Sequence, residues 1–195
     1  MKKLLSLLII FICSCESDYK TETIQVDNEH KINLPVFLSK TDTISQVAIL
    51  EYQNTKKKLY TIVITDTKAE FDDAIHKHTV LDKIYINDAT DPNNQYPSNL
   101  DGYSNYVLDF ITKRGISIDV ISDLEKTTIN GLNARIISIT GKADIDSTFY
   151  YWKFAFIEDK DKFYQVITWT LKNQENKYSR QMDSIIQSFE RINKS

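Results

Sequence analysis

The sequence contains very few cysteines, glycines and prolines: two, four and three among 195 residues. Both cysteines, Cys13 and Cys15, lie near the N-terminus, so the remainder of the chain can form no disulfide and offers no thiol chemistry. Four glycines cannot supply a glycine-rich phosphate loop, and the chain has no Gly-x-Ser-x-Gly elbow. These absences argue against a disulfide scaffold, a phosphate-loop enzyme and a serine or cysteine hydrolase.

Long hydrophobic runs are also missing. The apolar segment 4–13 has ten residues, which as a helix rise about 15 Å, half of a ~30 Å hydrocarbon core. It follows Lys2 and Lys3 and precedes Glu16 and Asp18, which is the order of an export signal. We therefore expect an exported protein that is not an integral membrane protein.

The end of this segment, Ile12-Cys13-Ser14-Cys15, resembles the bacterial lipobox, in which a small residue precedes an acylated cysteine. The resemblance implies that cleavage follows Ser14 and that Cys15 carries a diacylglyceryl group. Cys13 fits this role less well, because Ile12 would occupy the small-residue position. Several acyl chains would hold the protein on a lipid bilayer, since each buried CH₂ contributes about 0.8 kcal/mol. The alternative is an ordinary secretory signal with an incidental cysteine.

The charge balance of the expected mature chain is acidic. Without residues 1–14 it has 22 basic and 27 acidic residues, a net charge of −5, which argues against nucleic acid as a partner. We expect three regions: a signal peptide over 1–14, a lipidated N-terminus and polar tether over 15–31, and one domain over 32–195. Acidic residues directly after Cys15 are similar to the surface-export signals of some outer-membrane lipoproteins.

Hydrophobic patterning predicts an antiparallel sheet. Apolar segments joined in pairs by polar turns predict six strands, at residues 45–52, 59–66, 120–129, 132–140, 148–157 and 163–171. Asn130-Gly131 is the strongest of the hairpin signals. Amphipathic helices are predicted over 68–77, over 174–191, and from a cap at Ser98 to Arg114. Because segment 148–157 is apolar on both faces, we expect an α+β fold, a three-layer α/β/α sandwich around a mostly antiparallel sheet.

The order of these elements is similar to that of the PsbP-like domains, which include DcrB-like envelope lipoproteins. The similarity spans 32–190 and rests on the segments Leu34-Pro35, Ile129-Asn130-Gly131, Phe163-Tyr164-Gln165-Val166-Ile167 and Ile185-Ile186-Gln187-Ser188-Phe189. It implies the same sandwich and, usually, a non-enzymatic adaptor, assembly or chaperone role. It offers no catalytic residues to transfer to this chain.

No metal or cofactor is expected. His76 and His78 lie near two aspartates, but side chains two positions apart on a helix point in different directions. Asp88 and Asp91 provide oxygen atoms that calcium prefers, without the EF-hand spacing or its glycine. The segment 79–97 is nevertheless long for a connection, and long loops are often functional. We therefore keep Asp88 and Asp91 as candidate binding residues.

A second candidate site depends on strand register. If residues 141–147 close a hairpin that pairs Thr140 with Thr148, then Arg135 lies opposite Lys153 on one face. Two adjacent cations repel unless an anion joins them, so the pair predicts a site for an anion or an acidic peptide. The alternative is that both stems lie on apolar surface and both charges pair with acidic residues.

The favoured function is a membrane-anchored envelope lipoprotein, a non-enzymatic module that binds a protein or peptide. The alternatives are a metal-dependent binder or enzyme that uses residues 72–78 or 88–94, and an immunity or inhibitor lipoprotein. The oligomeric state cannot be read from the sequence.

Overall fold

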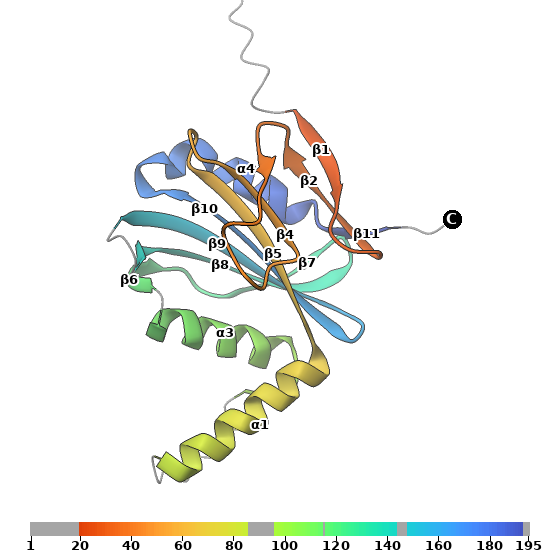
Figure 1. Ribbon diagram of the computed structural model, residues 1–195, viewed down its shortest axis with the longest axis vertical. Helices are drawn as coiled ribbons and strands as arrows, with labels where there is room; N and C mark the ends of the chain where they lie inside the picture. Colours follow the sequence, from red (N-terminus) through yellow and green to blue (C-terminus); the bar gives the residue numbers. More distant parts are fainter. Residues whose placement is uncertain (1–19, 86–95, 115, 144–147, 193–195) are drawn as a thin grey trace, which may run out of the picture.

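The computed structural model describes residues 20–85, 96–114, 116–143 and 148–192. Its main sheet (Figure 1) is antiparallel, in the order β3-β4-β5-β10-β9-β8-β6, and β7 also pairs with β8. The strands are β3 (Ser39–Lys40), β4 (Leu50–Asn54), β5 (Leu59–Thr67), β6 (Ile116–Ile121), β7 (Glu125–Ile129), β8 (Leu132–Ala143), β9 (Phe149–Asp159) and β10 (Lys162–Leu171). A smaller antiparallel sheet, in the order β1-β2-β11, is formed by β1 (Thr21–Gln25), β2 (His30–Pro35) and β11 (Glu190–Arg191).

Helices cover both faces of the main sheet. On one face lie α1 (Lys68–Tyr85) and α3 (Leu100–Arg114), whose apolar residues share a core cluster with Trp152, Phe154 and Phe156 of β9. A short 3-10 turn, η1 (Lys172–Gln174), leads into α4 (Glu175–Gln187), which lies on the opposite face (Figure 1) with the residues of the other core cluster. The predicted α+β class and three-layer sandwich are confirmed.

The Asn130-Gly131 hairpin forms as predicted. Asn130 has φ 48° and Gly131 has φ 80°, the positive values that a two-residue type I′ turn requires at both positions. This turn fixes the register of β7 on β8, where Ile129 pairs with Leu132. The Asn130 side chain also donates hydrogen bonds to the carbonyl oxygens of Gln187 and Phe189, which ties the hairpin to the end of α4.

Several predicted element boundaries are wrong for local reasons. The strand predicted over 45–52 begins only at Leu50, because the Glu51 carboxylate accepts the backbone N–H groups of Ile44 and Ser45 and folds that segment back. The strand predicted over 120–129 is divided into β6 and β7 by three residues that face two on β8. The predicted cap at Ser98 is also wrong, since Asn99 accepts the Gly102 N–H instead.

The predicted tether is shorter than expected. Residues 21–25 and 30–31 were predicted to belong to it, but they form β1 and the start of β2. The apolar residues Ile32 and Leu34 of β2 are fully buried in the same core cluster as α4. Burial of these residues holds β2 against the core, and β2 in turn provides the pairing partner for β1, which is polar and largely exposed.

A buried charge network attaches the small sheet to the main one. His30 is buried, and its Nδ1 lies 3.1 Å from Asp27 while its Nε2 lies 2.7 Å from Asp159 at the end of β9. Each ring nitrogen of His30 therefore lies within hydrogen-bonding distance of a carboxylate. Asp159 also accepts hydrogen bonds from Arg191 of β11, and Tyr164 donates to Asp27. We call Asp27, His30, Asp159 and Arg191 the His30 network.

Acid should weaken this network. A hydrogen bond from Arg191 lowers the pKa of Asp159 despite its burial; burial raises the pKa of Asp27, but hydrogen bonds from Glu29 and Tyr164 outweigh it and lower the value. The pKa of an unfolded Asp lies near 4, above the lowered values of Asp27 and Asp159 in the folded protein. The stabilisation is therefore complete above about pH 4 and is lost as the pH falls through the folded-state pKa values. We expect urea titrations to give a level free energy of unfolding from about pH 7 to 5 and a steep fall below about pH 4. A free energy of unfolding that stays level down to about pH 3 would show that the network does not stabilise the fold.

Gly102 is a further constraint on α3. A Cβ atom at this position would lie 1.8 Å from the carbonyl oxygen of Pro97. An exposed helical Gly→Ala change normally stabilises a protein by about 1 kcal/mol, but here we expect Gly102→Ala to destabilise it by roughly 1–3 kcal/mol because backbone must move. The control is Asn105→Ala at an exposed position of the same helix. The free energy of unfolding in urea should fall for Gly102→Ala and rise for Asn105→Ala. A rise for both variants would show that a Cβ at position 102 does not clash with Pro97.

Candidate functional site

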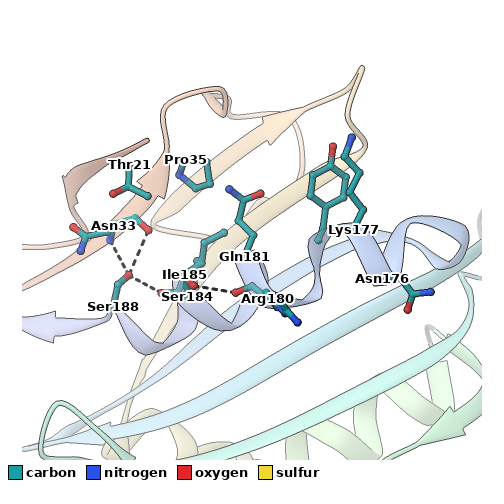
Figure 2. Close-up of a pocket in the computed structure, with 11 residues that line it drawn as sticks. Thr21, Asn33, Pro35, Asn176, Lys177, Arg180, Gln181, Ser184, Ile185 and Ser188 are labelled. Carbon is teal, nitrogen blue, oxygen red and sulfur yellow. Dashed lines mark hydrogen bonds between the residues drawn. The ribbon is translucent and has the colours of Figure 1, made fainter. Parts of the chain in front are cut away.

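A groove of about 710 Å³ runs between α4 and the small sheet (Figure 2). Thr21, Asn33 and Pro35 form its β-strand wall, and Thr21 pairs directly with Pro35. The other wall is one side of α4 with its C-cap residue Ser188, and its lining residues are Asn176, Lys177, Tyr178, Arg180, Gln181, Ser184, Ile185 and Ser188. The volume lies within the roughly 300–1,000 Å³ of ordinary ligand pockets.

The position of α4 follows from its buried stripe. Tyr178, Met182, Ile185 and Ile186 are buried, and burial of each such apolar side chain contributes about 1.5–3 kcal/mol. Ser188 then fixes the C-terminal end of the helix, because its Oγ accepts the Asn33 N–H at 2.9 Å. The same hydroxyl donates to the Ile185 carbonyl oxygen at 2.7 Å (Figure 2). The two walls of the groove are therefore fixed by the packing of α4 on the core and by the hydrogen bond between Ser188 and β2.

The strand wall does not favour addition of another β-strand. The backbone N–H of Asn33 already donates a hydrogen bond to Ser188 Oγ, and Pro35 has no N–H to donate. A ligand must therefore be recognised chiefly through side chains. Amide and hydroxyl groups of the lining can both donate and accept, which suits a ligand with exposed peptide groups.

The groove is positively charged in an otherwise acidic protein. Lys177 and Arg180 line it, and none of the described lining residues is acidic. The two carboxylates of α4 lie outside the lining: Glu175 pairs with Lys172, and Asp183 pairs with Lys153. The groove consequently favours ligands that carry carboxylate or other anionic groups.

Tyr178 adds an unusual feature. Its side chain is 2 % exposed and lines the groove, and the Lys177 ammonium lies 4.8 Å from the centre of its ring. Its hydroxyl finds no hydrogen-bond partner among the described residues. A buried hydroxyl without a partner costs roughly 1–3 kcal/mol, a cost that a ligand or a bound water can remove.

The anion site predicted at Arg135 and Lys153 is not formed. β8 pairs Thr140 with Tyr151, three residues beyond the predicted partner, so Ser138 is the residue opposite Lys153. An odd shift of register moves a side chain to the other face of the sheet. Arg135 therefore lies on the α3 face, where its Nε donates to Asp101 at 2.6 Å, whereas Lys153 pairs with Asp183 of α4. The alternative reading, in which each cation pairs with an acidic residue, is the correct one.

Asp101 forms ion pairs with both Arg135 and Lys126. Hydrogen bonds from Arg135 and then from Lys126 hold the pKa of Asp101 below its usual range. The arrangement is a surface ion-pair group at the start of α3, and such exposed pairs typically contribute under about 1 kcal/mol each.

The remaining predicted residues are not brought into one site. Cys15, Asp88 and Asp91 lie outside the described residues, so lipidation and loop binding stay predictions. His76 is exposed on α1. Within residues 20–85, 96–114, 116–143 and 148–192, no group of three metal-ligating side chains comes together. No helix of that same part of the chain has the length and apolar character to cross a bilayer.

Sequence reasoning missed the groove. The available signal was the polar side of the last predicted helix, which carries Asn176, Gln181 and Ser184 where glutamates and lysines are common. The strand wall could not be predicted, because residues 21–31 are polar and were assigned to the tether.

Comparison with known proteins supports the fold. No family model matches the sequence, and a search of curated proteins finds no significant match. The solution structure of cyanobacterial PsbP (CyanoP) from Synechocystis is similar, with a TM-score of 0.54 and 8% identity over 92% of this chain and 97% of that chain. The fold is thus PsbP-like, as the sequence predicted.

Two further solved structures match more weakly. The Ran-binding protein Mog1p of Saccharomyces cerevisiae has a TM-score of 0.49 and 10% identity, over 88% of this chain and 95% of that chain. LpqN of Mycobacterium tuberculosis, involved in cell envelope biogenesis, has a TM-score of 0.48 and 10% identity over 88% and 90% of the two chains.

Proposed function

We propose that this protein is an envelope lipoprotein, anchored in the outer membrane through acylated Cys15, whose domain binds a protein partner as a non-enzymatic adaptor. The partner contributes an extended segment that lies in the groove beside α4. The observation that carries this proposal is the groove itself, a preformed channel that offers two cations, several amides and several hydroxyls.

The dimensions of the groove fit a short peptide. The 13 residues of α4 extend about 20 Å at 1.5 Å per residue, and an extended peptide of about six residues covers the same length. Side-chain amides can bond its backbone, while Lys177 and Arg180 attract acidic side chains. Among the described residues that line the groove, none pairs a nucleophile with a base and none is a carboxylate, whereas amides, hydroxyls and two cations are present, and these groups favour binding.

Affinity capture tests the binding surface. We compare the full-length lipidated protein with Ser184→Trp, which fills the groove, and with Ser117→Trp, at an exposed position on β6. Proteins bound through the groove should be recovered from the cell's own membranes with the parent and Ser117→Trp, and lost with Ser184→Trp. Equal recovery of every protein by both variants would overturn the assignment of the groove.

The anchor is tested separately. Because Cys15 is the acyl acceptor of the proposal, Cys15→Ala should move the protein from the membrane fraction to the soluble fraction, without the mass of a diacylglyceryl group at its first residue. The matched control is Cys13→Ala, which keeps the acceptor cysteine. A Cys15→Ala protein that stays in the membrane fraction, or a mature chain that begins elsewhere, contradicts the anchor.

A further inference from the structure

Three exposed lysines lie at the end of the molecule where the described chain begins. Lys56 and Lys58 belong to the β4–β5 turn, and Lys20 is the first residue that the structure describes. This turn and the start of β1 lie at the same end of the molecule (Figure 1, top). The β2–β3 turn at this end adds an exposed apolar side chain, Val36, which is 41 % exposed. We call these four residues the lysine face.

Hydrogen bonds hold the segments of the lysine face together. The backbone N–H of Val36 donates to the carbonyl oxygen of Lys20 at 3.0 Å. On the other side, the Asn54 side chain donates to the carbonyl oxygen of Phe37 and accepts the Lys57 N–H, each at 2.8 Å. The Lys57 ammonium lies 4.6 Å from the centre of the Phe37 ring, so we do not count it in the lysine face. The start of the described chain and the two turns therefore form one continuous surface.

The lysine face is positively charged, although the whole chain has a net charge of −3. Lys20, Lys56 and Lys58 form no ion pair with any residue in the described part of the chain. Two carboxylates belong to the adjoining strands, Glu22 on β1 and Glu51 on β4. Glu51 is buried and accepts backbone N–H groups of residues 44 and 45, so it is directed away from the lysines. The surface consequently favours an anionic partner.

We infer that the lysine face docks the domain on a bilayer, with its ammonium groups against the anionic phosphates of the lipid headgroups. The inference rests on the proposed function, because the anchor Cys15 precedes Lys20 by five residues, which span at most about 18 Å. A tether of this length keeps the domain at the membrane and leaves open which of its surfaces faces the lipid. The lysines select that surface, since each lysine close to an anionic membrane favours the docked state about fivefold.

Docking through the lysine face also places the α4 groove beside the bilayer. Thr21 and Pro35 pair with each other in the strand wall of the groove, and they directly adjoin Lys20 and Val36 in the chain. A partner that is anchored in the same membrane can therefore reach the groove from the headgroup region.

The test places a fluorescent label on the mature lipoprotein after its reconstitution into vesicles that carry nitroxide-labelled headgroups, which quench the label on contact. Thr55→Cys, in the β4–β5 turn, supplies a single free thiol, because cleavage removes Cys13 and lipid blocks Cys15. The control label is at Asp161→Cys in the β9–β10 turn. Since β10 is antiparallel to β5, that turn lies at the opposite end of the sheet.

We expect the label at position 55 to be quenched strongly on vesicles of phosphatidylethanolamine with phosphatidylglycerol, and weakly on neutral phosphatidylcholine vesicles. The label at position 161 should be quenched little on either. Lys56→Gln with Lys58→Gln should lower the ratio of docked to undocked protein about 25-fold, because two attracted cations are lost. A salt concentration of about 0.5 M should have a similar effect.

The matched control is Lys77→Gln with Lys113→Gln, which neutralises two exposed lysines on α1 and α3 and should leave quenching unchanged. Quenching that is independent of lipid charge, or that falls equally in both double variants, overturns the lysine face. A mature chain without acyl groups would instead contradict the anchor. The same comparison, made after the protein is mixed with vesicles, then still decides whether the lysine face binds lipid, so the two failures are distinguishable.

Discussion

Asp159→Asn is expected to lower the free energy of unfolding by about 3–5 kcal/mol, the usual cost of removing one partner from a buried ion pair. The substitution keeps the shape of the side chain but removes the negative charge between His30 and Arg191. The Asp159 and His30 side chains are each 1 % exposed, so water cannot replace the lost partner without opening the structure. The main sheet would then lose its polar connection to β2 and β11.

The matched control is Asp161→Asn, which changes an exposed aspartate in the same β9–β10 turn. Urea unfolding at about pH 7 should place this variant within about 0.5 kcal/mol of the parent protein. The acid-induced fall in stability should also become shallower in Asp159→Asn, since one of the carboxylates with a lowered pKa is gone. A loss below about 1 kcal/mol would show that the network is not what holds the two sheets together.

The second large effect concerns binding rather than stability. Lys177→Glu with Arg180→Glu reverses both charges in the groove, and we expect it to weaken capture of the partner roughly 10- to 100-fold. Both side chains are exposed, so the midpoint of urea unfolding should change little. The charge-matched control is Lys77→Glu with Lys113→Glu, which reverses two exposed lysines on α1 and α3.

Capture yield from native membranes, quantified by mass spectrometry, checks this expectation at two salt concentrations. High salt should reduce the difference between the parent and the groove variant, because the ion pairs are exposed. Equal loss of capture in both double variants would attribute the effect to overall charge and contradict binding in the groove.

The sequence was informative where structure depends on local patterning. The Asn130-Gly131 turn, the two-faced apolar character of β9 and the amphipathic stripe of α4 each predicted an element correctly, and together they predicted the sandwich. The register of β8 on β9 was not accessible in this way. It depends on how far β8 extends before the connection after Ala143, and a shift of an odd number of residues reverses the face of every side chain.

The His30 network was hidden for a different reason. His30 and Asp159 are separated by 129 residues, and no periodicity in the sequence links such distant polar groups. The polar character of residues 21–31 suggested a tether, whereas pairing with β2 and the His30 contacts make it part of the fold. The groove depends on that same region for one wall, so the two were missed together.

Site-specific photo-cross-linking in living cells can show directly whether a partner lies in the groove. A photoreactive phenylalanine analogue at Gln181 reports on the groove, and the same residue at Glu125 reports on the exposed β7 strand. We expect a protein adduct at Gln181 that disappears when Lys177→Glu and Arg180→Glu are added, and no adduct at Glu125. An adduct at Glu125 with none at Gln181 would contradict binding in the groove, because the partner would then contact β7 and not α4.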